Sequence, residues 1–600
     1  MTVAIGHKLR VGVSGTRVFE DAELPRLRRE VEAVLRDIAA AAGGQVRLQI
    51  LSPLAEGADR LVAEVGLALV CPLPFPAEEY AKDFTAESSK DEFRRLLACA
   101  ETRMLELDGA RGDDEGRSYE AVGRLIVRNC DVLIGIWDGG PGKGRGGTHD
   151  IIHYAARSGP PVIWVHATEP QAPRWIEEAL DLRRHATPRA VSPALAIYIA
   201  RLLTPPEPPH GGPHSLVHRR AHHLIAGWHR LRRRKVPTPL EQFLGDGDAL
   251  VWGPWRLHAV VMKFLARGSS APWSGHAVPE TDEARAWFDH FKPADDWAGQ
   301  RAKIYRSSYV WTFFLGAVAL IFAALGLAGQ VFHSVEAIAT WVELIALGLI
   351  LALVAGDAGT GWQRKSIEYR LLAELCRKQQ VLAPLAWVVP RAGAWADTAP
   401  ALEPEADSPG DDGSGWVAWL FSAWLREQPL PSGGFTGARV AAAKAAALRD
   451  LIDEQITYHT TRRAQSKRAG ERLQRWGERA FFAVLILVAI KAAVVGFGPE
   501  HPGPALEWTM VGFGFLGVVL AAFSAAFVGM RAYAELEMLA AQSDMMLKAM
   551  RRAREQIETL DPANPLASQD LGNAVAAVAV LMLEDLQGWA RLFRAKVVEG

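Results

Sequence analysis

The feature that most constrains this chain is a set of four long apolar runs in its C-terminal half. The first lies between Arg306 and Glu336, an interval without Asp, Glu, Lys or Arg. The four runs cover residues 309–329, 338–356, 480–498 and 508–530. About 20 consecutive apolar residues suffice to span the hydrocarbon core of a bilayer. The sequence therefore predicts an all-α membrane domain with four transmembrane helices arranged as two hairpins.

Basic residues flank one end of every run. Three precede the first run, and seven lie between residues 462 and 479, directly before the third. The short turns at 330–334 and 499–507 contain no Lys or Arg. Because cytoplasmic flanks of membrane helices are enriched in Lys and Arg, we expect these turns to lie outside. This predicts a multi-pass protein of the inner (plasma) membrane with cytoplasmic N- and C-termini.

Two charged residues interrupt the apolar runs. Glu343 and Lys491 each fall about 8–10 Å below the outer surface, at ~1.5 Å per helical residue. Ionisable residues at such depth commonly pair or line a water-filled path. One hypothesis is that Glu343 and Lys491 form a polar pair across the membrane bundle or face a shared aqueous path. The alternative is that Glu343 extends outward to the interface.

The first 170 residues alternate short β-rich runs with helical patterns. Such alternation is typical of a mostly parallel sheet with helices on both faces, a Rossmann-like α/β fold. Ligands of these sheets bind at the carboxyl ends of the strands. The predicted strands are 9–13, 46–51, 67–72, 104–107, 132–137 and 162–165, and the helices between them include 24–42, 58–64, 118–129 and 149–158.

Three predicted strand-to-helix junctions are rich in small residues, namely 12–17, 52–60 and 138–150. Glycine permits close approach of the backbone to a ligand, and a helix N-terminus attracts phosphate. Three such loops at like ends of one sheet favour a phosphate or nucleotide site over simple turns. Neither GxGxxG nor GxxxxGK[ST] is present, so a dinucleotide-binding fingerprint and a P-loop are not supported.

Four segments, "VGVSGTR", "SPLAEGADRL", "YEAVGRLIVRNCDVLIGIWDG" and "GKGRGGTHDIIHYA", resemble the SLOG superfamily. That group includes DprA proteins, LOG phosphoribohydrolases and the N-terminal sensor of TRPM channels. The resemblance implies a pocket for a nucleotide-derived ligand, ADP-ribose-like or a cyclic nucleotide, and no other cofactor. The residues expected at this pocket are Ser14, Gly15, Thr16, Arg17, Glu56, Gly57, Asp59, Arg60, Arg128, Asp138, Gly146, Gly147, Thr148 and Asp150.

The enzymatic branch of the superfamily carries PGGxGTxxE after a helix that contains an arginine. Arg124 or Arg128 supplies that arginine here, but the position of the final Glu is Ile151. Asp150 lies one residue early, a rotation of about 100° on a helix. Glycosidic cleavage needs a carboxylate at the scissile bond, so this departure favours binding without turnover. No catalytic residue is assigned.

Between the two parts, residues 171–300 read as a helical and flexible connector. It carries His214, His218 and His222 at helical spacing and a basic stretch at 229–235. We expect solvated faces rather than a metal site, because no Cys or acid accompanies the histidines. The basic stretch suits anionic lipid. Residues 301–390 should form the first hairpin and a cytosolic helix, 391–435 a disordered loop, and 436–600 a stalk helix, the second hairpin and C-terminal helices.

The hairpins and stalks resemble SLATT and DUF4231-type membrane modules, with "QITYHTTRRA", "AEL" at 373–375 and "LEDLQGWARLFR" as the supporting segments. The resemblance implies an effector of a prokaryotic conflict or antiphage defence system. It would sense a nucleotide signal and gate or assemble a pore or ion channel, as a homo-oligomer. The alternatives are a membrane-tethered phosphoribohydrolase-like enzyme and a non-catalytic scaffold. With 67 Lys+Arg against 68 Asp+Glu, a nucleic-acid partner is not expected.

Overall fold

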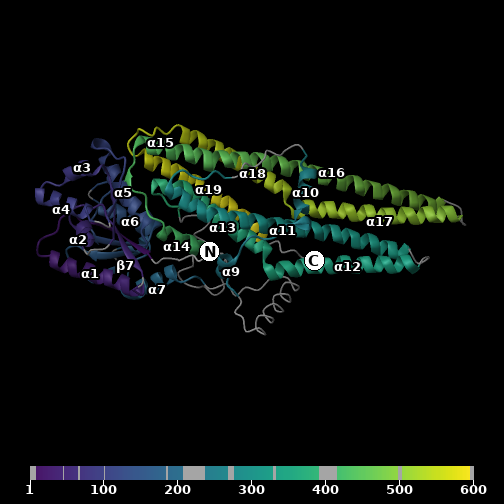
Figure 1. Ribbon diagram of the computed structural model, residues 1–600, viewed down its shortest axis with the longest axis horizontal. Helices are drawn as coiled ribbons and strands as arrows, with labels where there is room; N and C mark the ends of the chain where they lie inside the picture. Colours follow the sequence, from purple (N-terminus) through teal and green to yellow (C-terminus); the bar gives the residue numbers. More distant parts are fainter. Residues whose placement is uncertain are drawn as a thin grey trace.

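The structure is a computed structural model, and it places an α/β sheet at one end of a long array of helices (Figure 1). It describes residues 8–44, 46–64, 68–99, 102–142, 144–183, 187–206, 237–267, 276–328, 333–390, 415–497 and 503–594. The expected triplet of histidines at 214–222 and the basic stretch at 229–235 lie outside these residues.

The sheet has nine strands in the order β8-β7-β6-β5-β1-β2-β3-β4-β9. Neighbouring strands run parallel except where β7 and β8 add antiparallel to one edge. All six strands expected from the sequence are present, so the predicted α/β class is confirmed. The strands are β1 (Lys8–Gly15), β2 (Arg47–Leu51), β3 (Ala68–Leu73), β4 (Thr102–Glu106), β5 (Val132–Trp137), β6 (Val162–His166), β7 (Arg174–Ile176), β8 (Arg189–Ala190) and β9 (Gly433–Gly434).

Alternate strand residues enter two different cores, as the two-residue period of a strand requires. Leu133 and Val162 face α5 (Glu115–Asn129) and α6 (Thr148–Ser158). Their neighbours Ile134 and Ile163 face the opposite core. That second core contains side chains of α1 (Leu24–Ala41), α2 (Ala58–Ala63), α4 (Glu87–Leu97) and α7 (Val191–Leu203).

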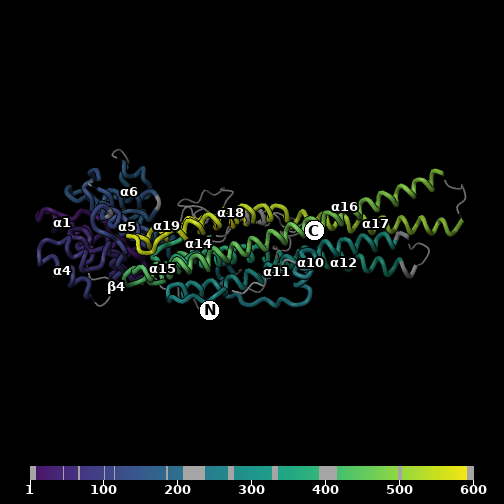
Figure 2. The backbone as a smooth tube through the Cα atoms, turned by 90° about the horizontal axis from the view of Figure 1, so that it is seen from above, coloured from purple at the N-terminus to yellow at the C-terminus, as the bar shows by residue number. Residues whose placement is uncertain are grey.

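Among the described residues, five helices or helix runs of the helical part are long and apolar enough to cross a membrane. Four contain the predicted runs, and they form two hairpins that point away from the sheet (Figure 2). The fifth is α19 (Ala567–Arg594), half of whose apolar window is buried inside the protein. The hairpin helices are α11 (Asp282–Ala328), α12 (His333–Thr360), α16 (Glu454–Phe497) and α17 (Pro504–Tyr533).

Two long helical segments, α11 and residues 437–497, extend from the hairpins toward the sheet. From Gly437 to Phe497 the chain is helical throughout, as α15 (Gly437–Ala446), a π-helical segment at 447–453 and α16. Below the fourth apolar run the helix is interrupted. Glu535 adopts φ 48°, which ends α17 and starts a separate helix, α18 (Leu536–Glu558).

Two expected boundaries are corrected. The sheet domain does not end at residue 170, because β7, β8 and α7 continue it to residue 203. The second half of the expected loop at 391–435 is folded: α14 (Gly415–Glu427) buries three tryptophans, and β9 pairs with β4. Tryptophans at helical spacing outweigh the Pro, Gly and Asp composition there. Residues 391–414 lie outside the described part of the chain.

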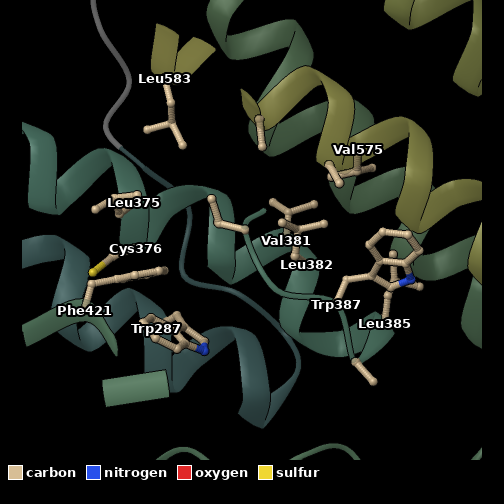
Figure 3. Close-up of a cluster of buried hydrophobic side chains, with 14 of the residues drawn as sticks. Trp287, Leu375, Cys376, Val381, Leu382, Leu385, Trp387, Phe421, Val575 and Leu583 are labelled. Carbon is tan, nitrogen blue, oxygen red and sulfur yellow. The ribbon is translucent and has the colours of Figure 1, made fainter. Parts of the chain in front are cut away.

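One hydrophobic core joins the sheet to the helices. It runs from α5 and α6 to α13 (Trp362–Leu382), α14 and α19 without interruption. Figure 3 shows Trp387 beside Leu385, with Val575 of α19 nearby. Polar contacts reinforce this interface, since Asn129 Nδ2 donates to the Ala386 carbonyl at 2.9 Å. The sheet and the helical part therefore pack as one body.

Candidate functional site

The candidate site lies where the strand order reverses. β1 is flanked by β2 on one side and by β5 on the other. The segment that follows β1 therefore crosses to one face of the sheet, and the segment that follows β5 crosses to the opposite face. In open α/β sheets this switch point forms the ligand crevice. The Thr16 amide donates to the Ile136 carbonyl at 2.9 Å, which fixes the two strand ends together. The first and third predicted loops thus meet at one edge.

The first loop is held by close backbone packing. A Cβ on Gly15 would overlap Ala58 of α2. Gly57 has φ 82°, and a Cβ there would lie 2.5 Å from the carbonyl oxygens of Thr16 and Arg17. These glycines serve helix–loop contact, and the Ala58 amide donates to the Thr16 carbonyl at 3.1 Å. Ser14, Thr16 and Arg17 are left at the accessible rim.

Asp59 is the most perturbed group of the site. Its side chain is buried, and its Oδ1 has no hydrogen-bond partner within the described residues. Burial raises the pKa of Asp59 to about 7, although the charge of Arg17 opposes this shift. A buried acid next to an exposed arginine at a switch point is a marker of functional sites.

Two other predicted residues of the second loop have structural partners. Arg60 donates to the carbonyl oxygens of Leu54 and Ser89 and to Glu92. Glu56 accepts a hydrogen bond from the Ser89 hydroxyl. The structure thus places Glu56 and Arg60 in the scaffold between α2 and α4, not at the rim.

The third loop leads into α6 with an uncapped helix N-terminus. Gly147 is the N-cap, and glycine has no side chain that could accept from the first amides. Gly146 has φ 78°, and a Cβ on it would lie 2.5 Å from the Glu120 amide nitrogen, so only glycine permits this approach to α5. Free amides at a helix N-terminus attract anions. Gly146, Gly147 and Thr148 are therefore brought to the same edge as Ser14 and Thr16.

Asp138 and Asp150 also lie at this edge. Asp138 accepts from the Gly140 amide at 2.9 Å and shapes the turn. Asp150 lies beside His149, with Oδ1 and Nδ1 3.2 Å apart. Ile151 is buried, and a Cβ on Gly123 of α5 would overlap its side chain. The side chain at position 151 points into the α5–α6 contact, so no acid occupies the place that the LOG pattern requires.

The structure separates Arg128 from the other predicted site residues. Its guanidinium carbon lies 3.7 Å from the centroid of the Trp387 ring, and its Nη2 donates to Gln569 at 3.0 Å. Burial lowers the pKa of Arg128 to about 10. Arg128 joins the sheet to the helical part instead of facing the loops.

The sequence analysis missed an aromatic group beside the third loop. The rings of Trp137, His149, His153 and Trp164 pack in succession, with centroids 4.3–6.1 Å apart. Planar rings of this kind stack on nucleobases. The signal was present as histidines four residues apart on α6, a tryptophan at the end of β5 and another in the middle of β6. A second missed contact is the Arg17 guanidinium, 5.1 Å from the Tyr119 ring centroid.

The two charged residues of the apolar runs, Glu343 and Lys491, lie on different hairpins. Lys491 of α16 points to α17, and its Nζ is 3.6 Å from the position of a Cβ on Gly514. Glu343 belongs to α12, which packs on α11. No ion pair joins Glu343 and Lys491 among the residues that the structure describes. Their expected pairing stays a prediction.

Comparison with known proteins adds no family: no family model, no curated protein and no solved structure matches this chain.

Proposed function

We propose that this protein is a membrane effector whose α/β domain binds a nucleotide-derived ligand and whose membrane helices respond to it. The binding edge offers an uncapped helix N-terminus for a phosphate, the Arg17 guanidinium, and aromatic rings for a base. The ligand class follows the SLOG resemblance, either an ADP-ribose-like molecule or a cyclic nucleotide. No catalytic role is assigned to any residue of the edge.

The observation that carries this proposal is mechanical continuity between the two parts. The same core contains Leu133 of the sheet and Val575 of α19. α11 and the 437–497 helix run from this core into the apolar runs without a break in the described chain. A ligand that prefers one of two arrangements of the sheet domain would therefore bias the hairpins directly.

A four-span topology with cytoplasmic termini is part of the proposal. α19 is apolar enough to be counted as a fifth span, but its first turn is held by the sheet domain. The Ser568 amide donates to Asp108, in the loop after β4, at 2.8 Å. A helix that begins on the sheet and packs along α13 has its apolar face covered by protein. We place it in the cytosolic stalk of an inner-membrane protein.

The experiment is ligand binding followed by liposome leakage. Detergent-purified protein is incubated with ADP-ribose, its cyclic isomers, cyclic oligonucleotides and nucleoside monophosphates, and bound and free species are measured by mass spectrometry. We expect one ligand to be retained intact, near one per chain, and to trigger release of a dye from proteoliposomes. Retention of no nucleotide would contradict the proposal.

Gly147→Glu supplies the matched variant, because it puts a carboxylate at the anion-attracting N-terminus of α6. Gly253→Glu is the control, since a side chain at Gly253 meets open space. We expect ligand binding and triggered leakage to be lost in G147E and kept in G253E. Leakage that survives in G147E would instead favour the scaffold, in which the sheet domain only docks a partner protein.

The enzyme alternative has its own readout in the same assay. Release of a free base from a nucleotide, abolished by Asp150→Asn, would identify a phosphoribohydrolase-like activity. Burial of Ile151 against α5 is the observation that disfavours it. A homo-oligomer would be needed for a wide pore, because four spans enclose little space.

A further inference from the structure

A second chemical site lies inside the helical part, away from the sheet loops. A cavity of about 470 Å³ opens between α10 (Leu257–Leu265), α11, α13, α16, α18 and α19. On α11 its lining extends from Ala298 to Tyr309, so it lies just on the sheet side of the first apolar run. This volume falls in the range of small-molecule sites, about 300–1,000 Å³.

The cavity is rich in positive charge. Its lining includes five Lys or Arg side chains and only two carboxylates, Glu374 and Asp585. Glu374 is shared among three cations: Arg370 at 2.7 Å, Arg377 at 2.8 Å and Lys378 at 2.7 Å. Its charge is therefore fully used. The five cations are Lys303, Arg306, Arg370, Lys378 and Arg462.

Three of these cations form no ion pair among the described residues: Lys303, which is exposed, and Arg306 and Arg462. The Asp585 carboxylate accepts from Gln542 Nε2 at 2.8 Å and interacts with the Arg462 charge only at longer range. Within the described residues, Arg306 and Arg462 make neither an ion pair nor a hydrogen bond, and Arg462 lies 5.7 Å from the Tyr458 ring centroid. The two guanidinium groups repel each other electrostatically. Like charges held together inside a protein are destabilising unless a counter-charge compensates them.

Two histidines of the cavity reflect its positive charge and its unpaired polar atoms. Burial, together with the charges of Arg306 and Arg462, lowers the pKa of His258 to about 3, so this ring stays neutral. His459 is 8% exposed, and its Nδ1 is buried without a hydrogen-bond partner in the part of the chain that the structure describes. Both rings line the cavity.

A phosphate group satisfies all of these features. It carries the charge that two unpaired guanidinium groups require, and its oxygens accept their bidentate hydrogen bonds and a third from His459. We propose that this cavity binds the phosphate group of a phosphorylated ligand between Arg306 and Arg462. The site is separate from the sheet loops and does not depend on the proposed function. The phosphate belongs either to a soluble phosphorylated molecule or to the headgroup of an anionic phospholipid, since the cavity adjoins the apolar run.

The test measures inorganic pyrophosphate binding to the full chain in detergent by calorimetry, with thermal unfolding in parallel. Arg306→Gln and Arg462→Gln remove the charge and keep an amide of similar length. Lys467→Gln is the matched control, because Lys467 is an exposed cation on the same helix outside the cavity. We expect each arginine variant to weaken pyrophosphate binding at least ~tenfold, as loss of a charge-assisted hydrogen bond does, and Lys467→Gln to change it less than ~twofold.

A second readout separates ligand binding from a merely structural role. Without phosphate, the arginine variants should unfold at or above the temperature of the native chain, because mutual repulsion is relieved. With pyrophosphate, only the native chain and Lys467→Gln should gain stability. If both arginine variants unfold earlier than the native chain and bind pyrophosphate equally well, the proposal is wrong.

Nanodiscs distinguish the two sources of phosphate. In phosphatidylcholine discs a soluble ligand site should still bind pyrophosphate. In phosphatidylglycerol discs a headgroup site should retain that lipid, as seen by native mass spectrometry, and exclude pyrophosphate. Either result supports the site if the binding of pyrophosphate or of the lipid is lost in Arg306→Gln and Arg462→Gln. Binding of neither pyrophosphate nor phosphatidylglycerol would overturn it.

Discussion

At the scale of single residues, one glycine and one tryptophan control how the sheet meets the helices. Trp387 packs beneath the Arg128 guanidinium on one side, and Gly572 of α19 passes its edge. A Cβ on Gly572 would overlap the indole nitrogen and its neighbouring carbons. Trp387 is buried and its indole is rigid, so relieving this overlap requires the ring or the backbone of α19 to move.

Gly572→Ala should therefore destabilise the protein by about 1–3 kcal/mol, the usual cost of overpacking. Gly588→Ala on the same helix meets open space and should stabilise it by about 0.5–1 kcal/mol, since alanine is the better helix former. Thermal unfolding checks this pair. Shifts of the same sign in both variants would refute the packing argument.

Asp59 predicts a pH dependence of stability. Its pKa in the folded protein is about 7, against 3.8 for an ordinary aspartate. Between these pH values the unfolded chain has lost the proton and the folded chain retains it, so stability falls as pH rises from about 4 to 7. Above pH 7 the loss of stability is constant, at most about 4 kcal/mol from 1.36 kcal/mol per pKa unit.

Asp59→Asn should remove this dependence. The variant should match the native chain near pH 4.5 and unfold at higher temperature at pH 8, because the amide cannot ionise. Asp21→Asn, at an exposed position, is the control and should follow the native chain at both values. If the difference in unfolding temperature between the native chain and D59N is the same at both pH values, folding does not raise the pKa of Asp59.

At the scale of elements, the start of α19 is the contact that links the sheet to the stalk. Asp108 follows β4, and its carboxylate accepts from the amide and hydroxyl of Ser568, while its carbonyl accepts from the Leu566 amide at 2.7 Å. A carboxylate at a helix N-terminus satisfies free amides and favours the helix dipole. α19 then continues along α13 to Asp585 at the cavity.

Asp108→Ala should loosen this end of α19 at a cost of about 0.5–2 kcal/mol, as loss of a helix cap does. Hydrogen exchange should accelerate in the peptide 566–575 and stay unchanged in α1. Asp113→Ala, an exposed acid nearby, is the control. Protection of 566–575 that is equal in both variants would mean that packing alone holds α19.

At the scale of the whole molecule, the sheet and the far ends of α16 and α17 lie at opposite ends (Figure 1). If the sheet domain is cytoplasmic, Glu507 at the start of α17 lies outside. Cys99 is an exposed thiol of the sheet domain, so the chain carries an internal marker for the other side. In intact cells, a membrane-impermeant maleimide should label Glu507→Cys and leave Cys99 unlabelled until the membrane is opened. Labelling of Cys99 in intact cells would invert the topology.

Much of this architecture is readable from local patterns. The apolar runs, the parallel strands and the glycine-rich loops follow from period, length and turn chemistry, which depend only on neighbours in the chain. Ser14, Thr16, Gly146 and Gly147 were placed together because carboxyl ends of parallel strands share one edge. Local pattern also misled, because the composition around residues 391–435 concealed α14, and Arg128 resembled a site residue.

What the tertiary structure alone decided is which polar groups face each other. In the sequence, Arg306 and Arg462 are ordinary members of basic flanks, 156 positions apart. Only the packing of six helices turns them inward to one cavity and leaves Glu374 shared among three other cations. The sequence by itself determined that the chain has a sheet domain and hairpins of long apolar helices, because hydrophobic period is a local property. The basic cavity needed the fold, because electrostatic balance depends on distances between residues far apart in the chain.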